Sequence, residues 1–132
     1  MLGHRFLLLE HRGRRTGRLY RTVLEVVEFD RVRGEAVVMS GRGRRAGWYR
    51  NVTAGGAVAI EIGGRRFAPE LRLLDADEAA AVLAVYERRN RFIAPLVRRV
   101  LSRLAGFEYY GSPEARLRLV QELPLVGFSL AA

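Results

Sequence analysis

The chain has 132 residues, 49% of them hydrophobic, which fits a single globular domain over residues 1–132 and argues against disorder. It contains no cysteine, so disulfides, thiolate metal sites and thiol catalysis are excluded. The formal net charge is +9 and every basic residue is an arginine; GC-rich coding explains part of this bias, and affinity for anions is the other explanation.

The first half of the chain predicts β-structure. Hydrophobic residues alternate or cluster in short runs, and Gly63-Gly64 is a strong signal for a two-residue hairpin. The segment after the glycine- and arginine-rich stretch predicts a short helix over 47–54. The expected strands are 6–10, 20–29, 35–40, 57–62 and 65–74, with turns at 11–17 and 30–34.

The second half predicts helices followed by one returning strand. Asp75 with Glu78 is a candidate capping box for a helix that ends near Asn90. Pro95 fits the first turn of a second helix, and Ser112-Pro113 the start of a third. A last strand is expected over 125–130. Strands first and helices later indicate an α+β domain around a mainly antiparallel sheet or barrel.

Two loops carry the candidate binding chemistry. The turn at 13–17 is Gly-Arg-Arg-Thr-Gly, in which backbone N–H groups, a hydroxyl and guanidinium groups could converge on a phosphate or carboxylate. The segment 40–51 is a second glycine–arginine loop that runs into Trp48, Tyr49 and Asn51. Together they favour a ligand with a ring and an anionic tail. The alternatives are an ordinary basic hairpin turn and an aromatic pair that anchors a helix to the core.

The remaining polar residues form no catalytic or metal-binding set. His4 and His11 lack a carboxylate motif that would complete a metal site, so no metal is expected. Ser40 has no nucleophile-elbow context. A hydrolase is therefore disfavoured, whereas a cofactor could supply the reactive atom of an enzyme.

The loops, in order along the chain, resemble the deazaflavin-dependent nitroreductase family. The resemblance rests on Gly-Arg-Arg-Thr-Gly-Arg at 13–18, Tyr-Arg-Thr-Val-Leu at 20–24, Ser-Gly-Arg-Gly at 40–43, Trp-Tyr-Arg-Asn-Val at 48–52 and Leu-Pro-Leu-Val at 123–126. It implies a split β-barrel, similar to flavin-mononucleotide-binding barrels, with peripheral helices. It also implies coenzyme F-420, which carries a deazaflavin ring, a phosphate and a polyglutamate tail. Many relatives have lysine where Arg15 stands and proline where Val23 stands.

The resemblance implies roles for particular residues. The tail and phosphate would be held by the first turn, and the ring by the second loop. Reduced deazaflavin would pass a hydride to an electron-poor small molecule such as a quinone, enone or nitro compound, with solvent or Ser40, Tyr49 or Tyr86 as the proton donor. The implied cofactor-binding residues are Arg14, Arg15, Thr16, Gly17, Arg18 and Arg21 for the tail, and Ser40, Gly41, Trp48, Tyr49 and Asn51 for the ring.

Two other functions remain open from the sequence. The first is a flavin mononucleotide (FMN) or haem binder of the same fold. The second is a non-catalytic basic module that binds nucleic acid or an anionic membrane, although no motif for specific nucleic-acid recognition is present. We expect a cytoplasmic protein, with a homodimer and peripheral membrane contact as further expectations. A solvated helix face is the simpler interpretation of Arg88, Arg89, Arg91, Arg98, Arg99 and Arg103, and a lipid-binding patch is the alternative.

Overall fold

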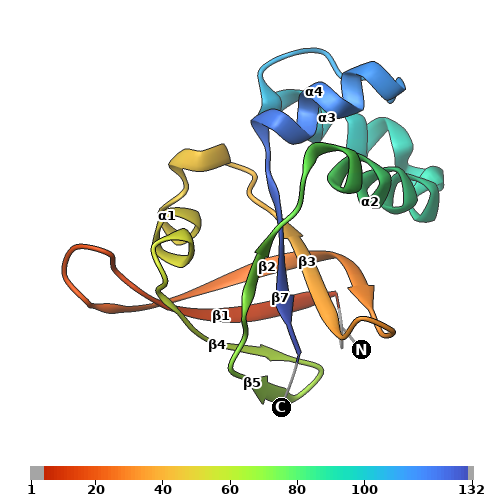
Figure 1. The fold of residues 1–132 in the computed structure, drawn as a ribbon. Helices are drawn as coiled ribbons and strands as arrows, with labels where there is room; N and C mark the ends of the chain where they lie inside the picture. Colours follow the sequence, from red (N-terminus) through yellow and green to blue (C-terminus); the bar gives the residue numbers. More distant parts are fainter. Residues whose placement is uncertain (1–4, 131–132) are drawn as a thin grey trace.

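The computed structural model describes residues 5–130, which form a strongly curled antiparallel sheet (Figure 1). Three of the helices, α2, α3 and α4, are gathered at one end of the sheet, and α1 lies apart from them. The sheet has seven strands in the order β5-β4-β1-β2-β3-β7-β6. The expected split β-barrel of mainly antiparallel strands with peripheral helices is confirmed. The strands are β1 (Phe6–Arg12), β2 (Leu19–Asp30), β3 (Glu35–Met39), β4 (Ala57–Ile62), β5 (Arg65–Phe67), β6 (Leu71–Leu73) and β7 (Leu125–Ser129).

The sheet curls because its two edge strands are joined by a very short connection. β5 and β6 stand at opposite ends of the strand order, which would place them about 29 Å apart in a flat sheet with about 4.8 Å between strands. Only residues 68–70 lie between β5 and β6, and the step from Phe67 to Leu71 can span at most about 14 Å. The two edges must therefore approach each other, and the sheet closes most of the way to a barrel.

Two hydrophobic cores lie on the two faces of this sheet. The first fills the inside of the curl and includes Val38 and Phe128. The second lies between the sheet and the helices and includes Val37 and Leu125. Neighbouring residues of β3 and β7 thus enter different cores, because successive side chains of a strand point to opposite faces. Both strands are consequently buried on both faces.

The helices begin where the sequence predicts, and α2 ends beside Asn90 as expected. Asp75 accepts a hydrogen bond from the backbone N–H of Glu78, and Ser112 from that of Ala115, so both expected N-caps are confirmed. None of the helices in the described part of the chain is long and apolar enough to cross a membrane. The helices are α1 (Gly47–Thr53), α2 (Ala76–Arg89), α3 (Ala94–Ala105) and α4 (Pro113–Glu122), with 3-10 turns η1 (Gly43–Arg45) and η2 (Arg91–Ile93).

Two predicted boundaries are wrong. The single strand expected over 65–74 is divided into β5 and β6, because Pro69 lies between them and has no N–H to donate to a sheet ladder. β1 continues to Arg12, where the sequence predicts a turn from residue 11. His11 therefore lies in the strand, paired with Tyr20.

Candidate functional site

The β1–β2 turn is closed by its own backbone. The N–H of Gly13 donates to the carbonyl of Arg18 at 2.8 Å, and the N–H of Gly17 donates to the carbonyl of Gly13 at 2.9 Å. Gly17 has a φ of 73°, a conformation that favours glycine. The Thr16 hydroxyl accepts from the N–H of Arg18 at 3.2 Å, so its own proton remains available to a ligand. The turn thus has a fixed shape and a free hydroxyl donor.

Asn51 ties this turn to helix α1. Its Oδ1 accepts from the backbone N–H of Arg14 at 3.1 Å and from Arg14 Nη1 at 3.0 Å. Its Nδ2 lies 2.9 Å from His11 Nδ1. Because Oδ1 is occupied by two donors, Nδ2 must face the histidine and donate to it. One buried amide therefore sets the position of Arg14 in both its backbone and its side chain.

The same contact fixes the protonation of His11. Nδ1 accepts from Asn51, so the ring proton is on Nε2, which lies 2.9 Å from Thr22 Oγ1. The imidazole is buried and stacks against Tyr20, with ring centroids 5.7 Å apart. Burial lowers the pKa of His11 below its usual 6.5. We conclude that His11 is neutral at physiological pH and supports the turn through Asn51.

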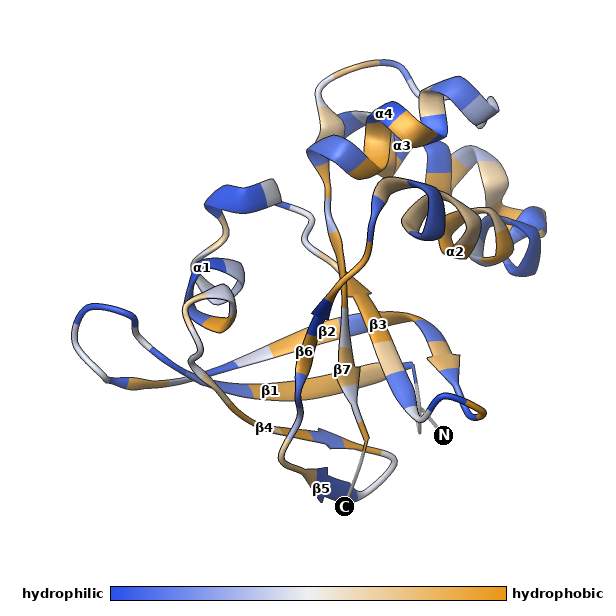
Figure 2. Cartoon of the chain, viewed as in Figure 1, coloured by the Kyte–Doolittle hydropathy of each residue, from blue (hydrophilic) through white to orange (hydrophobic). Residues whose placement is uncertain are grey.

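A basic cleft of about 440 Å³ opens between the β1–β2 turn and the start of α1. It contains guanidinium groups from the turn and from β2 and the indole of Trp48, and among residues 5–130 no carboxylate lines it. Figure 2 shows the turn as a hydrophilic segment that extends away from the apolar centre of the sheet. The lining residues are His11, Gly13, Arg14, Arg15, Thr16, Tyr20, Arg21, Thr22, Gly47, Trp48 and Asn51.

The carboxylate of Glu10, which lies beside Arg21, is already paired. Glu10 accepts two hydrogen bonds from Arg66, at 2.8 and 2.9 Å, and lies 3.4 Å from Arg21 Nε. The hydrogen bonds from Arg66 lower the pKa of Glu10 to about 2. Arg66 therefore carries most of the charge compensation of Glu10, and the basic cleft keeps a net positive charge.

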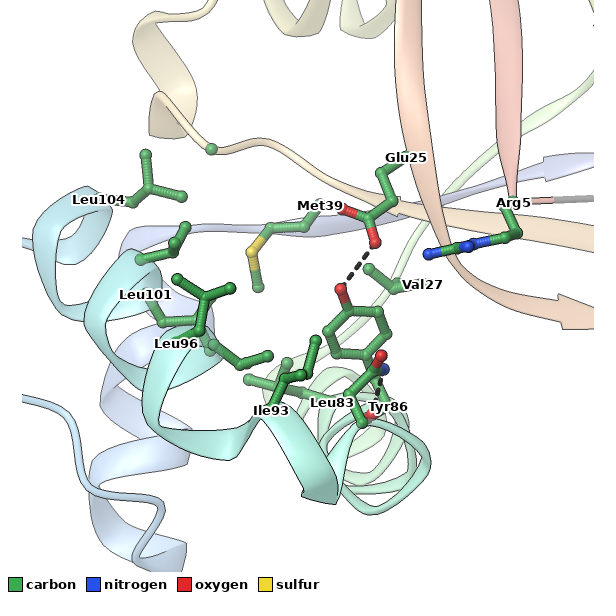
Figure 3. Close-up of a pocket in the computed structure, with 14 residues that line it drawn as sticks. Arg5, Glu25, Val27, Met39, Leu83, Tyr86, Ile93, Leu96, Leu101 and Leu104 are labelled. Atoms are coloured by element: carbon green, nitrogen blue, oxygen red, sulfur yellow. Dashed lines mark hydrogen bonds between the residues drawn. The ribbon is translucent and has the colours of Figure 1, made fainter. Parts of the chain in front are cut away.

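A second, apolar cleft of about 340 Å³ lies between β2, β3 and helices α2 and α3 (Figure 3). Its walls are aliphatic except at one end, where the Tyr86 hydroxyl donates to Glu25 Oε2 at 2.7 Å. Burial and this hydrogen bond raise the pKa of Tyr86 above its usual range. The lining residues are Arg5, Glu25, Val27, Met39, Gly41, Leu83, Tyr86, Asn90, Ile93, Leu96, Val97, Val100, Leu101 and Leu104.

Strand β2 runs from one cleft to the other. Arg21 lines the basic cleft and Glu25 the apolar cleft. They lie four residues apart on the same face of the strand, a distance of about 13 Å. Val23, between them on that face, is 68% exposed. The loop after β3 makes the same connection, from Gly41 in the apolar cleft to Gly47 in the basic cleft.

The structure brings together part of the predicted set. Six of the predicted binding residues line the basic cleft, and Gly41 and Tyr86 line the apolar cleft. Trp48 and Asn51, which the resemblance implies for the ring, thus lie beside the residues implied for the tail. The six are Arg14, Arg15, Thr16, Arg21, Trp48 and Asn51.

Other predicted residues line neither cleft. Ser40 is fully buried, and its hydroxyl donates to the carbonyl of Gly43 at 2.6 Å. Tyr49 is buried in the core inside the curl and meets Trp48 edge to face. These positions close a loop and anchor a helix, and they do not favour proton donation to a ligand. Gly17 and Arg18 contribute to the shape of the turn.

Sequence reasoning missed His11 and the apolar cleft. The partners of His11 are 11 and 40 residues away in sequence, so no local spacing reveals them. The apolar cleft has a partial signal, because Leu96, Val100 and Leu104 recur every fourth residue. The sequence predicts a helix for this segment, and the structure leaves all three side chains exposed on it.

The chain is similar to a known protein family and to solved structures. The model of the family described as F420H(2)-dependent quinone reductase matches residues 1–93. No curated protein matches the chain. A solved structure of an F420-H2 dependent reductase (FDR-A) is 15% identical, with a TM-score of 0.55 and coverage of 95% of this chain and 94% of that chain. A domain-swapped dimer is 17% identical, with a TM-score of 0.57 and coverage of 97% and 82%. At these identities the structural likenesses establish the fold alone.

Proposed function

Because the chain belongs to the F420H(2)-dependent quinone reductase family, it is a deazaflavin-dependent oxidoreductase, and we propose how its two clefts divide the work. The basic cleft holds the phosphate and acidic tail of coenzyme F-420. The ring extends along β2 toward the apolar cleft, where an electron-poor small molecule such as a quinone, enone or nitro compound is reduced. The observation that carries this proposal is a cleft with three arginines and no lining carboxylate among residues 5–130.

The donor set of the basic cleft fits the anionic part of the cofactor. Arg14 and Arg15 supply forked guanidinium groups, which suit phosphate and carboxylate oxygens. The Thr16 hydroxyl adds a neutral donor. Arg14 is held by Asn51 before any ligand arrives, so less ordering entropy is lost on binding.

The face of β2 suits the ring. Val23 is largely exposed, although it is an aliphatic residue in the middle of a strand. A flat aromatic ligand that covers it would bury apolar surface. The distance of about 13 Å from Arg21 to Glu25 matches a ligand with an anionic group at one end and a ring at the other.

When bound, the reduced cofactor supplies the hydride, and the protein positions the acceptor and excludes water. The aliphatic walls formed by Met39, Leu83 and Val97 lower the local polarity of the apolar cleft. Tyr86 is the one predicted proton donor that lines this cleft. Its proton is committed to Glu25, so solvent is the simpler donor to the product.

Titration of the purified protein with coenzyme F-420, with its tail-less deazaflavin ring and with FMN tests the proposal. Arg14→Ala with Arg15→Ala should weaken F-420 binding about 100-fold or more, since a hydrogen bond to a charged group contributes about 1.5–3 kcal/mol. The tail-less ring should bind the variant as it binds the wild type. Arg31→Ala with Arg65→Ala removes the same charge outside both clefts and is the matched control. Equal losses for F-420 and the tail-less ring would contradict the division between the clefts.

We also propose a homodimer. The support is the solved structure of similar fold that is described as a domain-swapped dimer. Light scattering of the purified chain tests it: a monomer mass over the whole concentration range would exclude the dimer.

A further inference from the structure

Helix α3 and the turn before it expose a continuous apolar surface. Figure 2 shows that hydrophobic and hydrophilic residues are mixed along the helices of this region. We call this surface, together with the arginines beside it, the α3 face. Its apolar members are Phe92, 85% exposed, Ile93, 49%, Leu96, 57%, Val100, 48%, and Leu104, 44%.

The helix is divided lengthwise into an apolar and a basic side. Leu96, Val100 and Leu104 are spaced by four residues and form one stripe along α3. At about 100° per residue, Arg99 and Arg103 lie directly beside this stripe. Leu101, on the opposite flank of the stripe, is buried in the second core. The outer edge of α3 therefore presents aliphatic side chains bordered by guanidinium groups.

The stretch of sequence around α3 contains no acidic residue, although Glu108 lines a surface hollow together with Arg99 and Arg103. Between Glu87 and Glu108 the sequence contains no aspartate or glutamate. Six arginines occur in this interval and all are exposed: Arg88, Arg89, Arg91, Arg98, Arg99 and Arg103. The α3 face is thus both apolar and strongly cationic.

Two partners fit this combination poorly. In a two-fold symmetric dimer the same patch meets itself, so arginines would face arginines with no carboxylate on α3 to separate them. Nucleic acid would pair with the arginines, but its phosphate backbone would leave the aliphatic stripe and Phe92 without an apolar partner. An anionic lipid surface fits both the apolar and the cationic part of the α3 face, because acyl chains can contact the apolar side chains and lipid phosphates can bind the guanidinium groups.

We propose that the α3 face docks on anionic lipid bilayers, with α3 lying in the plane of the headgroups. Phe92 and the exposed edge of the stripe enter the boundary between headgroups and acyl chains, and Arg99 and Arg103 bind lipid phosphates. The α3 face overlaps the apolar cleft, because Ile93, Leu96, Val100 and Leu104 also line that cleft. Phe92, Arg99 and Arg103 do not line it, so changes at these three residues test lipid binding separately from the proposed function. Helix α3 begins at Ala94, directly after the match to the family model ends at residue 93.

Cosedimentation with vesicles tests the proposal on the full chain. Vesicles containing phosphatidylglycerol are compared with pure phosphatidylcholine, at about 0.1 M and about 1 M salt. Phe92→Ser should weaken binding to anionic vesicles about tenfold, from the lost burial of an aromatic side chain. Arg99→Gln with Arg103→Gln should weaken it about 25-fold, at about fivefold for each arginine.

Matched controls carry equivalent changes away from the α3 face. Val32 is 100% exposed in the β2–β3 turn, and Val32→Ser is the control for Phe92→Ser. Arg31→Gln with Arg65→Gln is the control for the paired arginines, since Arg31 in the β2–β3 turn and Arg65 in β5 lie outside the α3 face. The contact of the β2–β3 turn with the helices is at the start of α2, where Arg33 donates to Glu78 at 3.1 Å. Both controls should bind within about twofold of the wild type. The altered side chains are exposed, and circular dichroism should show unchanged folding.

Three results would overturn the proposal. The first is equal binding to neutral and anionic vesicles. The second is equal loss in the α3 variants and their controls, which would indicate attraction by net charge alone. The third is duplex DNA binding that falls with Arg99→Gln and Arg103→Gln while vesicle binding does not, which would assign the arginines to nucleic acid.

Discussion

Replacing Asn51 by alanine tests the support of the basic turn most directly. Asn51 is 4% exposed and makes three hydrogen bonds, two with Arg14 and one with His11. Their loss leaves His11 Nδ1 buried without a donor. A net value of about 1 kcal/mol for each bond, and more for a stranded buried group, predicts a loss of about 2–4 kcal/mol in the free energy of unfolding. For a chain of this size that lowers the melting temperature by about 10 °C.

The measurement has two parts. Urea unfolding at neutral pH gives the stability change, and titration with coenzyme F-420 gives the effect on affinity. We expect about tenfold weaker binding, because Arg14 must then be ordered by the ligand. A stability loss under about 0.5 kcal/mol together with unchanged affinity would refute the role assigned to Asn51.

Asn51→Asp distinguishes the contact of residue 51 with Arg14 from its contact with His11. The carboxylate still accepts from Arg14, but it presents an oxygen to His11 Nδ1, and a nearby negative charge raises the pKa of a histidine. In the wild type the lowered pKa of His11 contributes stability that is present above pH 6.5 and is lost as the pH falls through the folded-state value. In the variant, a folded-state pKa above 6.5 would reverse this sign, with stability lost as the pH rises. NMR titration of the His11 ring protons measures this pKa in the variant. A pKa that stays below 6.5 in Asn51→Asp would contradict the contact between residue 51 and His11.

Three further changes test other parts of the structure. Gly43→Ala should lower the free energy of unfolding by about 1–3 kcal/mol, because Gly43 has a φ of 68° and an added Cβ would lie 2.9 Å from the Glu122 carbonyl. Gly47→Ala is the control, because no atom lies within 4 Å of its added Cβ. It should lower the free energy of unfolding by under about 1 kcal/mol in the same urea measurement. Arg72→Ala should lower the free energy of unfolding by about 3–5 kcal/mol, because Arg72 donates to buried Glu35 at 2.8 and 2.9 Å and its loss would leave that carboxylate with Arg33 at 3.8 Å. A loss as small as that of a surface pair in thermal unfolding would contradict this. Tyr86→Phe should leave the rate of hydride transfer within about threefold of the wild-type rate if solvent is the proton donor. Because the pKa of Tyr86 is raised, the wild-type pH–rate profile should show no tyrosine ionisation up to pH 10. A large loss of rate in the variant would instead identify Tyr86 as the proton donor.

Local signals in the sequence predicted local structure well. The caps at Asp75 and Ser112 and the hairpin at Gly63-Gly64 depend on residues within a few positions of each other, and all three are present. Pro69 was the signal that the strand over 65–74 is broken, and it was not used. Long-range pairing was beyond such reasoning: nothing near β7 indicates that it lies between β3 and β6.

The candidate site also combines features that are set locally with features that depend on the tertiary fold. The residue types of the turn predicted an anion site, because its arginines, threonine and glycines are close together in the sequence. The supporting contacts join β1, β2 and α1 through His11, Thr22 and Asn51, so they depend on the tertiary fold. The resemblance placed Trp48 at the ring, whereas the structure places it in the cleft of the basic turn.

The position of β7 also determines when the protein can fold during synthesis. β7 is the last strand in chain order, yet it pairs with both β3 and β6 and contributes Val126 and Phe128 to the inner core. Until the ribosome has released this segment, β3 and β6 lack a shared neighbour and the inner core stays open to water. Such late, non-local closure slows folding and leaves strand edges available to other chains. We therefore expect the native fold to form only after β7 has been synthesised and inserted between β3 and β6.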